Sequence, residues 1–157
     1  MRIGQSRDIH RLENNNRPLI IGGVRIPFDK GPVSHSDGDV LYHALAEAIL
    51  GSLAKGDLGT YFPDNDNKYL NMDSSIIVKY CYDLIKKEGY HIINIDANII
   101  LEKPKLKDYL LLMRQNMASL LEMNLDDISL KAQTNEKCGE VGENKAIEAT
   151  VSLLIEK

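Results

Sequence analysis

The segment 146–157, AIEATVSLLIEK, carries the pattern that most restricts how this chain can fold. Apolar side chains occupy every second position of it, at Ile147, Ala149, Val151, Leu153 and Ile155. Alternate residues of a β-strand point to the same face, so the pattern predicts a strand with one buried face. Such a strand needs partner strands beside it and a layer of side chains above it.

Helical segments upstream supply a layer of that kind. Apolar residues recur with helical spacing in 40–53, at Leu41, Leu45, Ile49 and Leu50, and Ser36, Asp37 and Asp39 offer three choices of N-cap. The same spacing in 74–89 predicts a second helix with an apolar face. That face comprises Ile77, Tyr80, Leu84 and Ile85.

The remaining segments complete a layered fold. We expect a hairpin over 2–28 with a turn at Gly22-Gly23, strands over 91–101 and 127–135, and a helix over 107–123. Segments 55–74 and 136–145 are predicted to be loops, and the first of them is rich in Gly, Pro, Asp and Asn. This order indicates an α+β fold. The prediction is a single domain over 1–157, a two-layer sandwich of a mixed β-sheet with helices on one face.

Charge and composition exclude several classes of protein. The formal net charge of −4 disfavours binding to duplex nucleic acid, which requires a basic surface. The longest apolar stretch, 44–54, is interrupted by Glu47 and Gly51, so no membrane span is expected. The N-terminal sequence lacks the features of a secretion signal, and the two cysteines, Cys81 and Cys138, are far apart. We therefore expect a cytoplasmic protein with no membrane association.

Asp8 and His10 are the most informative short motif. Residues i and i+2 of a strand share a face, and His43 near the start of the next helix offers a third ligand. Two histidines and a carboxylate with an open position are the ligands of catalytic zinc, although manganese or iron(II) also suits them. The alternative is a pair of polar residues at a strand edge and a helix histidine that is satisfied locally. Spacing alone favours this structural alternative.

Three further segments carry polar residues with two interpretations each. The loop His35–Asp39 precedes a helix, where it either binds an anion or only caps the helix. Asp57, Asp64 and Asp66 fit a ligand-binding loop or a solvated turn. Lysines after one strand and Glu136 after another fit a phosphate and divalent-ion site, or solvent-exposed strand ends.

Several motifs in order resemble one family. They are Asp8-x-His10, GGVRIPFDKG, His35-Ser36-Asp37-Gly38-Asp39-Val40 with His43, LGSLAKGDLGTYFPDND and KAQTNEKCGEVG. Together they resemble the 2-C-methyl-D-erythritol 2,4-cyclodiphosphate synthase family from Arg2 to about Ile155. The resemblance implies a metal-dependent cyclising phosphorus–oxygen lyase of the non-mevalonate (MEP) pathway of isoprenoid biosynthesis. Its substrate would be 4-diphosphocytidyl-2-C-methyl-D-erythritol 2-phosphate (CDP-methylerythritol 2-phosphate), and its products the cyclic diphosphate and CMP.

Roles follow from the resemblance residue by residue. Asp8, His10 and His43 match the ligands of Zn²⁺ (or Mn²⁺), and Glu136 matches a ligand of Mg²⁺ (or Mn²⁺) that bridges the diphosphate. His35 and Thr134 match positions with transition-state roles. The implied substrate-binding set is Asp8, Ile9, His10, His35, Ser36, Asp57, Leu58, Gly59, Phe62, Pro63, Asp64, Asn65, Asp66, Leu101, Glu102, Lys103, Pro104, Lys105, Leu106, Lys107, Gln133, Thr134, Asn135 and Glu136. The family forms a homotrimer with active sites between subunits, so the same assembly is implied.

The chain departs from the family at several positions. Gln5-Ser6-Arg7 stands where many members have His-Gly-Phe, which changes the packing beside the metal but removes no ligand. Glu140 and Glu143 stand where many members have Phe and Arg, on the central cavity of the trimer. Three copies of two glutamates would repel a diphosphate, so we expect isoprenoid diphosphates not to bind there.

Two competing functions remain in view. A nucleotide- or metal-binding trimer without activity would have lost a ligand, whereas all three ligands, Thr134 and Glu136 are present. A generic zinc phosphohydrolase would need a base that activates water, and it would release inorganic phosphate rather than CMP.

Overall fold

Strand β7 (Ala146–Glu156) lies at the centre of a five-stranded sheet in the computed structural model, which describes residues 1–157. The strand order is β4 (Gly31–Pro32), β1 (Arg2–Glu13), β7, β5 (His91–Ile100) and β6 (Ile128–Gln133). Only β5 and β6 are parallel; the other pairs are antiparallel, so the sheet is mixed as predicted. The five alternating apolar residues of β7 are all buried, which confirms the inward face of this strand.

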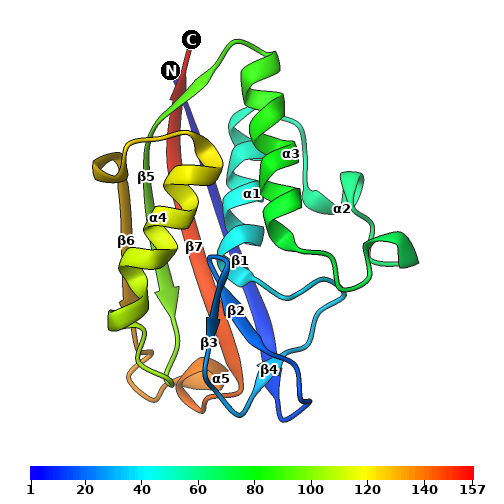
Figure 1. The fold of residues 1–157 in the computed structure, drawn as a ribbon, viewed down its shortest axis with the longest axis vertical. Helices are drawn as coiled ribbons and strands as arrows, with labels where there is room; N and C mark the ends of the chain where they lie inside the picture. The colour runs from blue at the N-terminus through cyan, green and yellow to red at the C-terminus, as the bar shows by residue number, and fades with distance from the viewer.

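Three helices cover one face of the sheet, as Figure 1 shows. Helix α1 (Val40–Ser52) packs against β1 and β7, α3 (Ser74–Lys87) packs against α1, and α4 (Leu110–Leu121) packs against β6. The predicted two-layer α+β architecture is therefore confirmed. No long helix packs on the other face of the sheet, called the bare face below, although Val141 packs on Ile100 and Ala146 at one end of it. The side chains of Ile3 and Ile9 on this face are 68% and 42% exposed.

Strand β1 and helix α1 approach each other unusually closely because residue 4 is glycine. A Cβ atom on Gly4 would lie 2.0 Å from the carbonyl oxygen of Ala48. The helix therefore rests directly on the strand backbone, which brings the start of α1 next to the inward side chains of β1. This contact fixes the spacing on which the candidate site depends.

Asp39 decides where α1 begins. Of the three N-cap choices in the sequence, only Asp39 accepts a hydrogen bond from the first turn, at Tyr42 N. Its carboxylate also accepts from the backbone N–H groups of Gly22 and Gly23, in the predicted turn between β2 (Leu19–Ile21) and β3 (Val24–Ile26). One buried carboxylate thus anchors the hairpin to the helix.

Both segments predicted as loops contain short helices. Segment 55–74 includes α2 (Leu58–Tyr61) and the 3-10 turn η1 (Asn67–Tyr69), and 136–145 includes α5 (Gly139–Gly142). Elements of three or four residues are too short to produce a periodic pattern, so the prediction of plain loops was wrong there. Two more 3-10 turns, η2 (Lys107–Tyr109) and η3 (Leu125–Asp127), flank α4. As a result α4 begins at Leu110, three residues later than expected.

The predicted apolar face of α3 was wrong at one position. Ile77 and Ile85 are buried as expected, whereas Tyr80 is 42% exposed. Its ring instead packs against the rings of Tyr61 and Phe62, with centroids 5.6 and 5.3 Å away. Tyr80 therefore supports the 55–74 segment, which projects beside α3 in Figure 1. None of the helices is long and apolar enough to cross a bilayer.

Candidate metal centre and substrate pockets

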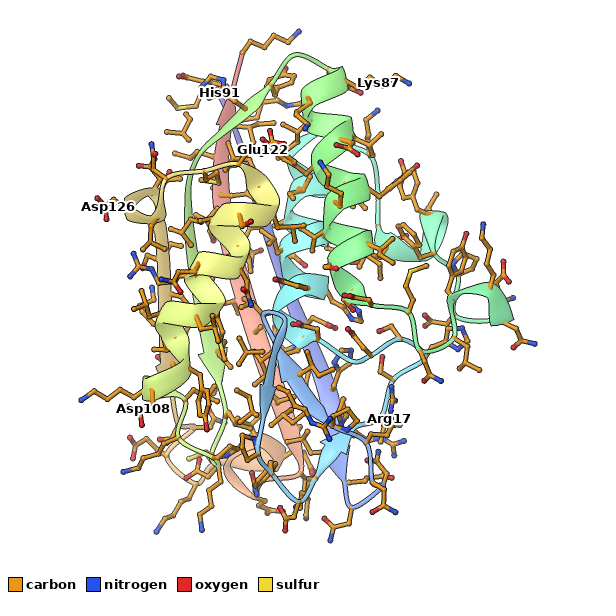
Figure 2. All side chains as sticks on the ribbon, in the orientation of Figure 1. Arg17, Lys87, His91, Asp108, Glu122 and Asp126 are labelled. Carbon is orange, nitrogen blue, oxygen red and sulfur yellow. The ribbon has the colours of Figure 1, made fainter.

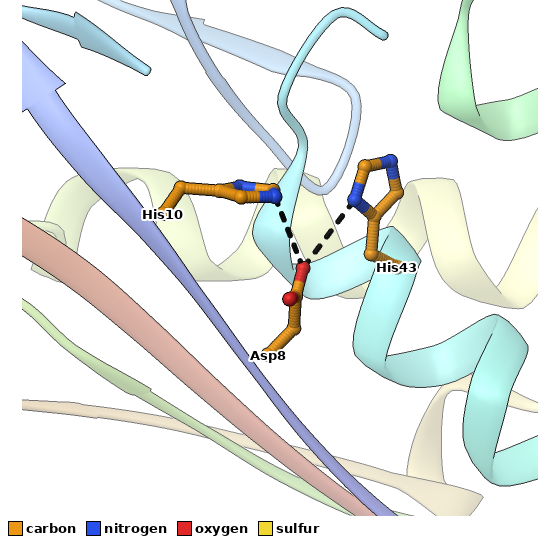
Figure 3. A group of neighbouring side chains, drawn as sticks. All are labelled: Asp8, His10 and His43. Carbon is orange, nitrogen blue, oxygen red and sulfur yellow. Dashed lines mark ion pairs between the residues drawn. The ribbon is translucent and has the colours of Figure 1, made fainter. Parts of the chain in front are cut away.

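The fold brings Asp8, His10 and His43 together. Asp8 and His10 are inward residues of β1, and His43 lies in the first turn of α1. The Oδ2 atom of Asp8 is 3.2 Å from Nε2 of His10 and 3.3 Å from Nδ1 of His43 (Figure 3). One ligand atom from each residue lies within 4.8 Å of the others. The sequence interpretation of three ligands around one point is thus matched by the geometry.

The outer hydrogen bonds of His10 show which of its nitrogens faces the centre. Its Nδ1 lies 3.1 Å from the carbonyl oxygen of Gly38, and a carbonyl can only accept, so Nδ1 carries the proton. Nε2 therefore presents a lone pair toward Asp8. Gly38 has a φ of +78°, and a Cβ there would meet Pro32 at 2.3 Å, so only glycine lets this carbonyl face His10.

The donor set fits a divalent ion. The Oδ2 atom of Asp8 is buried and accepts no hydrogen bond, although it faces two imidazole rings. An unpaired carboxylate oxygen in such a position is costly unless a cation satisfies it. Two imidazoles and one carboxylate are the ligands that catalytic zinc uses when it keeps an open position. The residues present therefore fit the metal that the resemblance implies.

Asp8 and His43 shift each other's pKa toward the charged forms. Burial alone raises the pKa of Asp8, but the adjoining His43 and His10 rings outweigh it and hold this pKa below its usual value. Burial likewise opposes charge on His43, yet Asp8 raises the pKa of His43 above its usual value. For His10 burial prevails and lowers the pKa. The Asp8 carboxylate therefore favours positive charge at this point, which is what a cation site requires.

A pocket of about 380 Å³ opens in front of these three residues. Its lining includes His35 and Ser36 from the predicted anion-binding loop, and Leu58, Gly59, Phe62 and Asp64 from segment 55–74. Polar loop residues thus surround the metal ligands. The structure in this way joins three of the segments that the sequence had singled out separately.

Arg17 fixes the loop that lines this pocket, and sequence reasoning missed it. Its guanidinium donates to the carbonyl oxygens of Pro32, Ser34 and Ser36. In Figure 2 it lies beside the segment that leads from β4 toward α1. An arginine in a polar stretch between strands has no sequence signal of its own, because the carbonyls that it binds are remote in the chain.

His35 and the 57–66 segment meet at the mouth of the pocket. Nε2 of His35 lies 2.9 Å from the carbonyl oxygen of Asp66 and so donates to it, which leaves Nδ1 for a ligand. Asp57 caps α2 by accepting from the N–H and hydroxyl of Thr60. Asp57, Pro63, Asn65 and Asp66 do not line the pocket itself, and they shape the segment around it.

Glu47 is a second pocket residue that sequence reasoning did not select. It lies one helical turn after His43 on α1, and its carboxylate accepts from the Ser6 hydroxyl and from Leu58 N. The i, i+4 spacing between His43 and Glu47 was the available signal, since such residues share a helix face. Glu47 thereby links β1, α1 and the start of α2.

The other predicted half of the site forms a separate pocket of about 330 Å³. The residues of the implied substrate set that line it come from two loops: Leu101, Glu102, Pro104, Lys105, Leu106, Lys107, Gln133 and Thr134. The two loops are held together because Asn135 N donates to Glu102 Oε2 and Leu101 N donates to the Gln133 carbonyl. Lys103, Asn135 and Glu136 are sequence neighbours of these lining residues, but they do not line the pocket.

The two pockets do not meet within one chain. Asp8 pairs with Ala149, Ala149 with Ile99, and Ile99 with Ala132 of the second pocket, so both lie at the same level of the sheet. Three strand spacings, about 14 Å, separate them across the sheet. Thr134 and Glu136 are therefore remote from Asp8, His10 and His43 in the single chain.

Ile9, Glu140 and Glu143 lie away from both pockets. The Ile9 side chain points to the bare face of the sheet and lines a third pocket with Glu140 and Lys145. Glu143 forms an ion pair with Lys145, which lowers the pKa of Glu143. Lys145 thus offsets part of the negative charge that the sequence had suggested for this region.

Comparisons with known proteins agree with the geometry. The model of the YgbB family matches residues 1–156. The 2-C-methyl-D-erythritol 2,4-cyclodiphosphate synthase of Geobacillus sp. (strain WCH70) is 46% identical over 99% of this chain and 98% of its own length.

Solved structures give the same result. IspF of Plasmodium falciparum, in a CDP complex, is 38% identical with a TM-score of 0.86, over 98% of this chain and 94% of that chain. The bifunctional IspDF of Campylobacter jejuni is 38% identical with a TM-score of 0.93. The match covers 98% of this chain but 42% of that longer one.

Proposed function

The chain belongs to the YgbB family, and on that premise we propose that it is a metal-dependent cyclising lyase of the non-mevalonate isoprenoid pathway. It converts CDP-methylerythritol 2-phosphate to 2-C-methyl-D-erythritol 2,4-cyclodiphosphate and releases CMP. The observation that carries this proposal is the convergence of Asp8, His10 and His43 on one point inside a pocket lined by His35 and Ser36.

The reaction brings negative charges together, and in this acidic chain the compensating positive charge must come from groups within the active site. The 2-phosphate oxygen must attack the β-phosphorus of a diphosphate, so one anion approaches another. Zinc held by Asp8, His10 and His43, together with magnesium held through Glu136, would supply Lewis-acid stabilisation of the phosphate charge. With a net charge of −4, the chain as a whole does not provide this stabilisation.

The protein residues orient the substrate around these charges. Ser36 and His35 would hold the methylerythritol phosphate end, and the segment beginning at Asp57 would close over it. Because the attack is intramolecular, holding the substrate in a folded conformation contributes much of the rate enhancement. No protein nucleophile is required. The Thr134 hydroxyl would donate to the charge that develops on the diphosphate.

The cytidine and diphosphate would bind the second pocket. Lys105 and Lys107 line it and supply cations next to an apolar floor formed by Leu101, Leu106 and Leu110. This chemistry suits a nucleotide, whose base has flat faces that pack on apolar side chains and whose phosphates are anionic. The full substrate-binding set named from the sequence remains our proposal for both pockets.

A homotrimer would complete the active site. The two pockets lie about three strand spacings apart in one chain, so a neighbouring subunit must supply the nucleotide half. The bare sheet face, with exposed Ile3 and Ile9, offers apolar surface for such an assembly. Each site would then combine the metal half of one subunit with the Thr134 half of the next. We place this trimer in the cytoplasm.

Co-expression of two inactive variants tests this arrangement. His43→Ala damages only the metal half and Thr134→Ala only the nucleotide half, so mixed trimers contain some sites built from two intact halves. Random mixing at equal amounts restores about one quarter of the sites, because each half is intact with a probability of about one half. Two separately purified variants, mixed without subunit exchange, are the control. No recovery on co-expression would contradict an interfacial site.

Product analysis separates the proposed reaction from its alternatives. CMP together with the cyclic diphosphate supports the cyclase. Release of inorganic phosphate would indicate the zinc phosphohydrolase instead. Binding of CDP without turnover would indicate a trimer that binds the nucleotide but lacks activity.

A further inference from the structure

A chain of hydrogen bonds runs from His43 away from the metal pocket. Nε2 of His43 lies 2.9 Å from the hydroxyl of Ser74, the first residue of α3. That hydroxyl lies 2.5 Å from Oδ1 of Asp37. Ser74 is fully buried, so water does not compete for these contacts. Nothing in the reaction described above uses Asp37 or Ser74.

The direction of these hydrogen bonds follows from the chemistry of the three groups. A carboxylate only accepts, so the Ser74 hydroxyl donates to Asp37. The Ser74 oxygen is then an acceptor for His43, which must carry its proton on Nε2. Nδ1 consequently presents a lone pair toward Asp8, 3.3 Å away. This is the form of the ring that binds a metal ion through Nδ1.

We propose that Asp37 and Ser74 form a relay that fixes the tautomer of His43 and so sets the affinity of the metal centre. The inference rests on the metal site of the proposed function. Histidine ligands commonly donate their outer N–H to a carboxylate, and here a serine hydroxyl is inserted between the two groups. Asp37 and Ser74 are positioning residues, because they act through His43 and contact neither metal nor substrate.

A second hydroxyl, that of Ser36, shows why Asp37 is needed to fix the tautomer of His43. The Ser36 hydroxyl is also 2.9 Å from Nε2 of His43, but it contacts no carboxylate. Its proton is free to point at Nε2, which would favour the tautomer with the proton on Nδ1. The Asp37–Ser74 pair decides between the two tautomers. The Ser74 hydroxyl gives its proton to Asp37, so its oxygen can only accept from Nε2 of His43.

Asp37 is itself held from two sides. Its carboxylate accepts from the backbone N–H groups of Ser74 and Asp39, and its own N–H donates to the Met72 carbonyl. The relay therefore joins the pocket loop to the end of segment 55–74. Displacement of that segment would disturb the outer contact of His43.

Zinc affinity in a double-mutant cycle tests the relay. Zn²⁺ binding is measured by competition with a chelator of known affinity for the wild type, Asp37→Asn, Ser74→Ala and the double variant. We expect each single substitution to lower the affinity about 10- to 100-fold, the usual effect of losing an outer partner of a metal ligand. The double variant should bind zinc no more weakly than the weaker of the two single variants, because either substitution alone already interrupts the relay.

Matched variants separate the relay from a structural effect. Asp73→Ala removes the N-cap of the same helix, which accepts from Ser75 N, but does not touch His43, so zinc affinity should be unchanged. Ser74→Thr keeps the hydroxyl and should restore affinity. Nitrogen-15 NMR of the neutral His43 ring in the metal-free protein should show a proton on Nε2, and this signature decides the question if Ser74→Ala does not fold.

Other results would overturn the relay. Additive losses in the double variant would mean that Asp37 acts on the fold rather than through Ser74. Unchanged zinc affinity in both single variants, or a proton on Nδ1 of the neutral His43 ring in the metal-free protein, would also exclude it while leaving the metal site intact. A wild type that does not bind zinc would instead contradict the proposed function.

Discussion

The Ser6 hydroxyl of β1 donates a 3.1 Å hydrogen bond to the Glu47 carboxylate of α1. Ser6 belongs to the Gln5-Ser6-Arg7 segment, just before Asp8. Its neighbour Arg7 points to the opposite face and pairs with Glu148. The segment therefore contributes a polar contact beside the metal ligands and an ion pair on the bare face.

Glu47→Ala should weaken substrate binding more than metal binding. The substitution removes the acceptor for Ser6 and for Leu58 N, so the start of α2 loses its anchor over the pocket. A hydrogen bond to a charged group contributes about 1.5–3 kcal/mol, so we expect KM to rise about tenfold or more. Zinc content should not change. Steady-state kinetics together with metal analysis checks this prediction. Asp83→Asn, on the exposed face of α3, is the control and should change neither KM nor zinc content.

Gly4→Ala should destabilise the fold. Its Cβ would lie 2.0 Å from the Ala48 carbonyl, so α1 must move away from β1. Overpacking of this kind typically costs about 1–3 kcal/mol. Gly51→Ala, on α1, is the control, because a Cβ there would meet nothing within 4 Å. This substitution should raise the free energy of unfolding by up to about 1 kcal/mol. Urea unfolding measures both, and equal stabilities would contradict the close contact.

Asp39 predicts a pH dependence of stability. Burial raises the pKa of Asp39 from 3.8 to about 6, although three backbone N–H groups oppose the shift. The folded state therefore holds this proton more tightly than the unfolded state. The stability gained is fully present below about pH 3.8 and is lost as the pH rises through about 6, a loss of about 3 kcal/mol.

Asp39→Asn isolates this effect. The amide does not titrate, and it places an N–H₂ group against one of the backbone donors, so the variant should be less stable at pH 4. The difference from wild type should shrink as the pH approaches 7. Urea unfolding from pH 4 to 7 measures it, and a difference that stays constant with pH would exclude Asp39 as the titrating group.

Thr134→Ala should lower turnover with little change in KM. A well-aimed hydroxyl donor to developing charge is worth about 10²–10³ in kcat. Thr134 is exposed in the single chain and bonds only to Glu136 N, at 3.4 Å, so its loss should not disturb the fold. Thr134→Ser, which keeps the hydroxyl, should retain most activity. Turnover that is unaltered in Thr134→Ala would remove this residue from the mechanism.

The strong periodic patterns of the sequence were sufficient for the main elements. The alternation of β7 and the apolar spacing of α1 predicted both elements correctly, because each buries a complete face. Tyr80 was misplaced because its partners, Tyr61 and Phe62, lie in a segment with no pattern of its own.

The site was predicted in parts rather than as a whole. Asp8, His10 and His43 carried a spacing signal, and the polar loops were selected from their residues with two interpretations each, between which the resemblance chose. The roles of Arg17 and Ser74 depend on contacts between residues distant in sequence, so no local pattern indicates them. Glu47 had only its i, i+4 spacing from His43 as a signal. The separation of the two pockets follows from strand order, which single-sequence patterns do not determine.

Phosphorus-31 NMR of the purified protein with CDP-methylerythritol 2-phosphate tests the central claim most directly. We predict that the cyclic diphosphate and CMP appear with the metal-loaded protein, stop after a zinc chelator, and return when zinc is added back. His43→Ala should give no product even with added zinc. Cyclisation that continues undiminished in the chelated protein, or inorganic phosphate as the product, would contradict the account.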